Sequence, residues 1–223
     1  MEEWWTKDIG CFCLVSMFTG KHMNAYVDLF RHGQAASGGL MTGGRDVPLS
    51  EQGEAEIRFW QKSLSNLFFD QAFSSPLLRA RQTARMLLEA HPLSARELRI
   101  VPDLREVSLG EWEGKSTIEV KRDYADIWEA RGRDIIHVSP PGGESMRDLA
   151  DRVLPTFRAV LSGAVPGKNM LIAAHQAVNR VLLAAIEGLA LDRVPSIPQP
   201  PGGLNSLEVA GQGRVASLVP RLL

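Results

Sequence analysis

The stretch Tyr26-Val-Asp-Leu-Phe-Arg-His-Gly33 joins a short run of strand-forming residues to a cation, an imidazole and a glycine. Such a run is typical of a buried β-strand, and in open α/β sheets ligands bind beyond the carboxyl ends of the strands. Arg31 would bring a fixed positive charge to that edge, and His32 a nitrogen able to act as nucleophile, base or donor. Gly33 would let the backbone turn tightly. Because an isolated Arg-His-Gly is also a common polar strand end, other motifs in the chain are needed to tell whether it is catalytic.

The composition predicts a single globular α/β domain. The chain has 223 residues, of which 44% are hydrophobic and 23% charged, and its formal net charge is −1. Without a strong net charge or blocks of like charge, we expect neither a nucleic-acid nor a membrane partner. The two cysteines, Cys11 and Cys13, are too few for a disulfide framework or a structural zinc site. We therefore expect a cytoplasmic protein that binds no metal.

Residues 1–22 are predicted to form a peripheral N-terminal extension ahead of a domain at 23–223. The apolar run from Ile9 to Phe18 is too short to span a bilayer. It also follows acidic residues, where a signal peptide requires basic ones. An extra packed element and a targeting function remain alternatives for this extension.

A second histidine occupies a similar place in the sequence. The continuous apolar run from Met170 to Ala174 predicts a central strand, and His175 follows it directly. An apolar helix is predicted from 176 to 187. A single buried histidine is more often structural, but two at the ends of adjacent strands favour a functional site. His32 and His175 are therefore expected to meet at one edge of the sheet.

Arg79 is predicted to face the same edge. A short strand is expected from Gln71 to Ser74, followed by a helix with Ser75 as its N-cap and Pro76 at its first position. Arg79 would then lie in about the first turn, where free backbone amides and the helix dipole already favour an anion.

Two other helices have recognisable starts. One is predicted to begin at Ser50, and a second at Ser145, which forms a capping box with Asp148. Pro155 is expected to kink or divide the second helix. The residues expected to face inward from the first helix are Ala55 and Phe59, with Ile57 and Leu64 as further candidates.

Several spaced motifs occur in order between residues 26 and 219. They are Arg31-His-Gly33, Pro48-Leu-Ser-x-x-Gly53, Ser74-Ser-Pro-Leu-Leu-Arg-Ala-Arg-Gln-Thr-Ala84, Leu104-Arg-Glu-Val-Ser-Leu-Gly-Glu-Trp-Glu-Gly114, Gly142-Gly-Glu-Ser145 and Ala174-His175. Together they resemble the first branch of the histidine phosphatase superfamily, also called phosphoglycerate mutase-like. The combination is far more specific than any one of these motifs alone.

The resemblance implies a three-layer α/β/α fold with a mostly parallel, doubly wound sheet. It also implies a metal-independent, cofactor-free phosphomonoester hydrolase that acts on a small phosphorylated metabolite through a phosphohistidine on His32. Arg31, Arg79 and a protonated His175 would surround the phosphate, and Glu106 would serve as general acid and base. The resemblance and the loop positions suggest further substrate-binding residues, namely Gln34, Ser37 and Gln176.

The choice of reaction and substrate stays open at this point. The sequence departs from the family in lacking Trp-Asn after Arg-His-Gly and in having Gln176 where glycine is usual. The stretch from Leu109 to Gly114 resembles the phosphatase form, and the helical insertion expected at 116–141 is short for a phosphoglycerate mutase. We predict that this insertion, with Gln34, Trp112 and Lys115, selects the substrate. The alternatives are mutase-type transfer, α-ribazole phosphatase, phosphoprotein phosphatase and a non-catalytic phosphate-binding protein. The protein could form a homodimer whichever of these functions it has.

Overall fold

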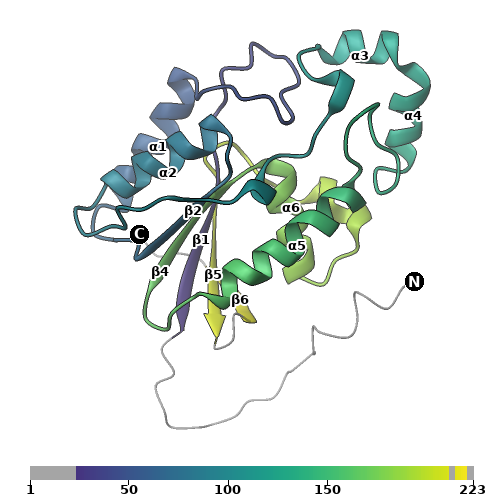
Figure 1. The fold of residues 1–223 in the computed structure, drawn as a ribbon. Coiled ribbons are helices and arrows are strands. Elements are labelled where there is room, and N and C mark those ends of the chain that lie inside the picture. Colours follow the sequence, from purple (N-terminus) through teal and green to yellow (C-terminus); the bar gives the residue numbers. More distant parts are fainter. Residues whose placement is uncertain (1–23, 211–213, 220–223) are drawn as a thin grey trace.

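The computed structural model describes residues 24–210 and 214–219, which form one mixed sheet between two layers of helices (Figure 1). The strands, in order across the sheet, are β3 (Arg99–Ile100), β2 (Gln71–Ser74), β4 (Asn169–Ala174), β1 (Ala25–Arg31), β5 (Leu204–Ala210) and β6 (Arg214–Val219). The first four are parallel, whereas β5 is antiparallel to β1 and β6 is antiparallel to β5. The predicted α/β fold with a mostly parallel sheet is confirmed.

Helices cover both faces of the sheet. One face carries α1 (Glu51–Ser63) and α2 (Leu78–Glu89), and the other carries α5 (Met146–Ser162) and α6 (Gln176–Ile186) (Figure 1). Successive residues of a strand point to opposite faces, so Leu29 packs in the core under α5 and α6, and Phe30 in the core under α1 and α2. Strands buried on both sides need continuous apolar runs, which explains the sequence of β4. The run of β1 is interrupted by Asp28, which is fully buried and accepts a hydrogen bond from the Ser206 hydroxyl at 2.7 Å.

Helix α1 begins as predicted but presents a different face to the core. The Ser50 hydroxyl accepts a hydrogen bond from the Gly53 amide at 3.0 Å, as expected of an N-cap. Ile57 is fully buried, whereas Ala55 is exposed and Phe59 is 61% exposed. The helical period places Ile57 on the face of Gly53 and turns Ala55 and Phe59 away from it. The prediction that Ala55 and Phe59 point inward is wrong.

Two other local expectations are also wrong. Helix α2 begins at Leu78, and Leu77 occupies the N-cap position without a side-chain hydrogen bond. Ser75 and Pro76 therefore precede the helix. Helix α5 does start with the predicted capping box, but it continues through Pro155 as one helix, so the alternative that Pro155 divides it is wrong and the alternative that it kinks the helix stays a prediction. The proline ring lies on the exposed side of this helix.

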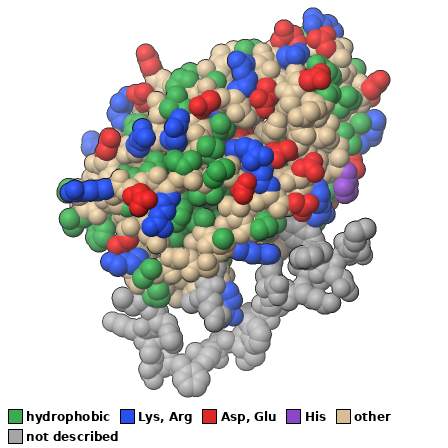
Figure 2. All heavy atoms as spheres, in the orientation of Figure 1, with side chains coloured by type: hydrophobic (Ala, Val, Ile, Leu, Met, Phe, Trp, Pro, Cys, Tyr) green, Lys and Arg blue, Asp and Glu red, His purple; other side chains and the backbone are tan. Residues whose placement is uncertain are grey.

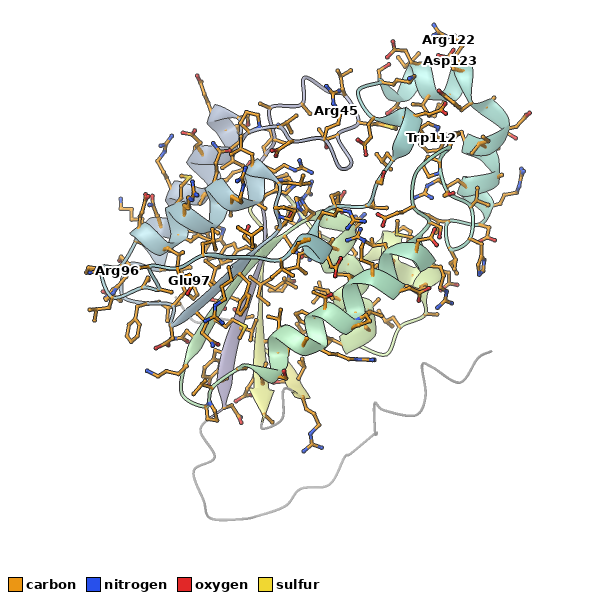
Figure 3. The ribbon with its side chains drawn as sticks, in the orientation of Figure 1. Arg45, Arg96, Glu97, Trp112, Arg122 and Asp123 are labelled. Carbon is orange, nitrogen blue, oxygen red and sulfur yellow. The ribbon has the colours of Figure 1, made fainter. Side chains whose placement is uncertain are left out.

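The segment predicted as a helical insertion contains α3 (Thr117–Asp123) and α4 (Ala125–Arg133), which project beyond the end of the sheet (Figure 1). Trp112 lies beside these helices (Figure 3) and is only 2% exposed. Its ring centroid is 6.4 Å from that of Tyr124 and 5.5 Å from that of Trp128. Trp112 is thus a packing residue of this small unit.

The surface of the described residues carries both positively and negatively charged side chains. Figure 2 shows Lys and Arg side chains interspersed with Asp and Glu over one face of the molecule. In the part of the chain that the structure describes, no helix is long and apolar enough to cross a membrane. The N-terminal extension lies outside the described residues. The domain organisation and the cytoplasmic location stay predictions from the sequence.

Candidate active site

The two histidines meet because they follow paired positions on adjacent parallel strands. Arg31 is the register partner of Ala174, and the His32 amide donates to the Ala174 carbonyl at 3.1 Å. His175 directly follows β4 as the N-cap of α6, and the two imidazole centroids lie 5.0 Å apart with an interplanar angle of 63°. The structure therefore brings His32 and His175 together at the carboxyl edge of the sheet, as the sequence predicts.

The contacts of His32 determine which ring nitrogen carries the proton. Nδ1 lies 2.7 Å from the carbonyl oxygen of Gly33, and Nε2 lies 3.1 Å from Nε of Arg79. A carbonyl only accepts and a guanidinium only donates, so Nδ1 bears the hydrogen and Nε2 presents its lone pair. Burial, together with the charge of Arg79, lowers the pKa of His32 to about 3. The ring is therefore neutral and available as a nucleophile at Nε2.

Two glycines allow the loop after β1 to approach helix α1 closely. A Cβ atom on Gly33 would lie 2.4 Å from the carbonyl oxygen of Gly53, and one on Gly53 would lie 2.1 Å from that of Gln34. Neither position can hold a side chain without displacing backbone. This contact explains why the Arg-His-Gly and Pro-Leu-Ser-x-x-Gly motifs occur together.

Two arginines face the imidazole of His32. Arg79 is 1% exposed, and its terminal nitrogens donate to the carbonyl oxygens of Arg45 at 2.7 Å and Gly43 at 2.9 Å. Arg31 donates to the carbonyl of Gln199. Burial lowers the pKa of both guanidiniums, and the nearby carboxylate of Glu106 opposes that effect. Arginine remains charged in proteins, so the site holds two fixed positive charges.

His175 is fully buried and held by a serine that precedes α2. Its Nε2 lies 2.6 Å from the Ser75 hydroxyl oxygen, which also accepts from the Leu77 amide. The serine hydroxyl can then donate its hydrogen to Nε2, so the ring proton of the neutral imidazole lies on Nδ1. This Nδ1 is buried and has no hydrogen-bond partner among the described residues. Burial, and then the neighbouring His32, lower the pKa of His175 well below its ordinary value. A lowered pKa favours the neutral ring, whereas the sequence led us to expect a protonated His175 around a bound phosphate, and that expectation stays a prediction.

Glu106 enters the same site from the loop after β3. One carboxylate oxygen accepts from the Val107 amide at 3.0 Å, and the other accepts from the Ala177 amide at 3.3 Å. Burial raises the pKa of Glu106, although these two hydrogen bonds and the charges of Arg79 and Arg31 act in the opposite direction. A raised pKa favours the protonated carboxyl group, which can donate a proton.

An ion pair clamps the loop that carries Glu106. Arg152 of α5 donates to both carboxylate oxygens of Glu144, at 2.9 and 2.8 Å, and to the carbonyl of Arg105 at 3.1 Å. Glu144 in turn accepts from the Ser108 amide at 2.9 Å, and its own amide donates to the Ser108 carbonyl at 2.8 Å. The clamp thus holds backbone on both sides of Glu106, a contact that the sequence analysis missed.

These residues surround a cavity of about 360 Å³. His32, Arg31, Arg79 and Glu106 line it, and so do three of the further candidates predicted from the sequence, Gln34, Ser37 and Gln176. His175 packs against His32 without lining the cavity. Among residues 24–210 and 214–219, no group of three His, Cys, Asp or Glu side chains is placed to hold a metal ion.

The other predicted selectors of substrate do not reach this cavity. Trp112, Lys115 and the 116–141 segment are absent from its walls. Lys115 instead donates to the Glu111 carbonyl at 2.9 Å and lies 5.8 Å from the ring centroid of Tyr124. Helices α3 and α4 lie beyond the end of the sheet (Figure 1), and Trp128 of α4 packs against Trp112. That these residues select the substrate stays a prediction.

The sequence analysis also missed two residues that hold the core groups in place. Ser75 hydrogen bonds to His175, and Gln199, only 4% exposed, supplies the carbonyl that binds Arg31. A capping signal in the sequence did single out Ser75, but for a different role. No periodic or motif signal marks Gln199.

The family model for branch 1 of the histidine phosphatase superfamily matches residues 27–220. The chain belongs to this superfamily. A 2,3-bisphosphoglycerate-dependent phosphoglycerate mutase of Methylobacterium radiotolerans is 36% identical over 185 residues, covering 78% of this chain and 85% of the relative. Superfamily relatives of this chain thus include proteins named as mutases.

Similar solved structures of the superfamily are named as phosphatases. The α-ribazole phosphatase of Shigella flexneri has a TM-score of 0.75 and 25% identity, and the match covers 85% of this chain and 93% of that one. A mycobacterial glucosyl-3-phosphoglycerate phosphatase has a TM-score of 0.71 and 27% identity, with coverages of 83% and 91%. Relatives by sequence and by structure therefore carry different reactions on this fold.

Proposed function

We propose that the protein is a metal-independent phosphomonoester hydrolase that works through a phosphohistidine on His32. The observation that carries this proposal is the neutral His32 ring, whose Nδ1 proton is bound to Gly33 and whose Nε2 lone pair accepts a hydrogen bond from Arg79 in a cavity that Arg31 also lines. Such a nitrogen can attack phosphorus, and the arginines can hold the charge of the transferring group. The substrate would be a small phosphorylated molecule bound in the cavity.

The first step forms a bond between Nε2 of His32 and phosphorus while the bond to the leaving oxygen breaks. Arg31 and Arg79, which line the cavity, would bind the phosphoryl oxygens, and their charges are fixed before the substrate arrives. The buried Nδ1–H of His175 lies behind His32 and would donate only to an oxygen of a phosphoryl group held directly against that ring. Protonated Glu106 would give its proton to the departing oxygen. In the second step, water would return a proton to Glu106 and attack phosphorus, which breaks the bond to His32.

The lining of the cavity favours a phosphatase over a mutase. A mutase that works with bisphosphoglycerate must hold a second phosphate and a carboxylate, so it needs cations apart from the transfer site. The cations that line this cavity among the described residues are Arg31 and Arg79, both beside His32. Its other walls carry neutral side chains such as Gln34, Leu109 and Gln176. Among the described residues, no further cation lines the cavity for a second anion, and Arg180, which acts on Arg31, is not part of its walls.

Product analysis distinguishes the candidate reactions. A phosphatase should release inorganic phosphate from several phosphomonoesters, with no conversion of 3-phosphoglycerate to 2-phosphoglycerate when bisphosphoglycerate is added. Isomerisation faster than phosphate release would favour the mutase. Absence of any turnover, including that of p-nitrophenyl phosphate, would favour a phosphate-binding protein. Activity should also survive a chelator and be inhibited by vanadate, which mimics five-coordinate phosphorus.

A further inference from the structure

A second hollow lies next to the active-site cavity. It has a volume of about 350 Å³, within the range of ligand-binding pockets. Pro201 forms part of the wall of both hollows. We call the second one the aromatic subsite, and it is lined by Gln52, Ala55, Glu56, Phe59, Trp60, Pro201 and Gly202.

The aromatic subsite offers a preformed surface for a ring. Phe59 is 61% exposed and plays no part in the buried cores. Its ring centroid lies 5.5 Å from that of Trp60, with an interplanar angle of 75°. Trp60 is held in place, because its indole N–H donates to the Gly202 carbonyl at 2.8 Å and its ring packs edge-on against Phe30. An aromatic pair of this kind binds flat, apolar rings.

Glu56 gives the same subsite a negative charge and connects it to the active site. One of its carboxylate oxygens accepts from the amide of Gln34 at 2.9 Å, and Gln34 lines the active-site cavity. The charge of Glu56 also acts on Arg31. Since like charges repel, a substrate whose far end is a carboxylate or a second phosphate would be disfavoured here.

We propose that the aromatic subsite binds the end of the substrate farthest from its phosphate, and that this end is an uncharged or cationic ring. The inference rests on the proposed function and names the substrate class for it. The phosphate would lie beside His32, and the chain would pass Pro201 to place its ring against Phe59 and Trp60. Short anionic substrates such as phosphoglycerate would gain nothing from this surface.

A matched pair of substrates tests the proposal. Phenylbutyl phosphate and butyl phosphate have the same kind of leaving oxygen and differ only in a distal ring. We expect the wild-type protein to favour the phenyl compound by about tenfold in kcat/KM, mainly through KM, which is the size of one good aromatic contact. Phe59→Ala should remove most of this preference. Leu93→Ala, a control that shortens an apolar side chain of similar exposure (69%) outside both hollows, should retain it.

Glu56→Gln tests the charge of the aromatic subsite. The variant keeps an oxygen for the Gln34 amide, so it should specifically improve the use of a butyl phosphate that ends in a carboxylate. Its kcat/KM for that compound should rise several-fold relative to butyl phosphate. An unchanged ratio would contradict the role given to Glu56.

Two further outcomes separate this inference from the proposed function. Equal kcat/KM values for the phenyl and plain compounds, or a preference that persists in Phe59→Ala, would overturn the subsite and leave the hydrolase standing. Calorimetry with His32→Ala measures binding of both compounds without turnover, so the subsite is tested even if the protein hydrolyses neither. A tighter complex with phenylbutyl phosphate that depends on Phe59 would support it.

Discussion

Arg79 donates its Nε–H to Nε2 of His32 across 3.1 Å, while its two terminal nitrogens are bound to backbone carbonyls of the 34–47 loop. One side chain from α2 therefore orients the imidazole at the end of β1 and is itself held rigidly. The relationship makes the position of the guanidinium as important as its charge. A lysine could supply charge at this position, but it could not make the three directed hydrogen bonds.

Arg79→Lys should slow formation of the phosphoenzyme by about 10²–10³-fold, the usual cost of losing a preorganised donor to the transferring group. Rapid-quench measurement of the first turnover would show this. Arg85→Lys, on the exposed side of the same helix, provides the control and should behave like the wild-type protein. A loss below threefold in Arg79→Lys would show that charge alone suffices.

Brief incubation with ³²P-labelled substrate should leave a phosphate on His32 that is stable to alkali and labile to acid. His32→Ala should not be labelled, because it lacks the attacking nitrogen. His137→Ala, which removes an exposed histidine outside the cavity, should be labelled normally. Persistent labelling of the His32 variant would place the nucleophile on another residue.

The pH dependence of the first step should follow Glu106 rather than His32. Because the pKa of His32 is lowered to about 3, its Nε2 lone pair is available throughout the mildly acidic range. Burial raises the pKa of Glu106, so its donating form persists to higher pH than an ordinary glutamate and is lost as the pH rises through that pKa. Single-turnover rates with an alkyl phosphate should therefore fall on the alkaline side, and Glu106→Gln should remove this fall.

Glu106→Gln should also slow the first step in proportion to how much the leaving oxygen needs a proton. We expect a loss of about 10²–10⁴-fold with alkyl phosphates and a much smaller loss with p-nitrophenyl phosphate. Single-turnover phosphorylation is the proper measurement, because Glu106 also has a role in the second step. Glu111→Gln is the matched control, since Glu111 is exposed and outside the cavity walls. Equal slowing of both substrates would assign proton delivery to another group.

The Glu144–Arg152 clamp should influence proton delivery because it holds the loop of Glu106. Arg152→Lys keeps a charge beside Glu144 but loses directed bonds to that carboxylate and to the Arg105 carbonyl. We expect kcat for alkyl phosphates to fall about tenfold, with little change in KM and little effect on p-nitrophenyl phosphate. Arg158→Lys on the exposed side of α5 is the control. Uniform loss with both substrates would indicate a purely structural effect.

Much of the site could be predicted from the sequence because its main residues follow strong local patterns. His175 comes directly after the continuous apolar run of β4, and His32 comes one residue after the strand-forming run of β1, and parallel strands bring their carboxyl ends to one edge. Arg79 follows a third strand within a few residues. Glu106 was different, since only the family motif distinguished it from the other carboxylates of its loop. These predictions needed strand order and motif spacing but no detailed packing.

The wrong predictions concern side chains whose position is set by residues distant in the sequence. Phe59 was expected inside because it is apolar, yet the pairing of Gly53 with the 33–34 backbone sets the rotation of α1 and leaves Phe59 at the surface. Ser75 resembled a helix cap, but it hydrogen bonds to His175, one hundred residues away in sequence. Trp112 was singled out only as a selector of substrate, and its packing against Tyr124 and Trp128 had no signal in the sequence.

By itself the sequence determined the fold class, the strand edge at which the site lies and the residue types gathered there, because these depend on short-range patterns of polarity. Only the tertiary structure decided the chemical state of those residues. The tautomer of His32, the lowered pKa of His175 and the raised pKa of Glu106 each depend on burial and on particular donors and acceptors. Those partners come from other strands, helices and loops, and their distances do not exist until the chain has folded.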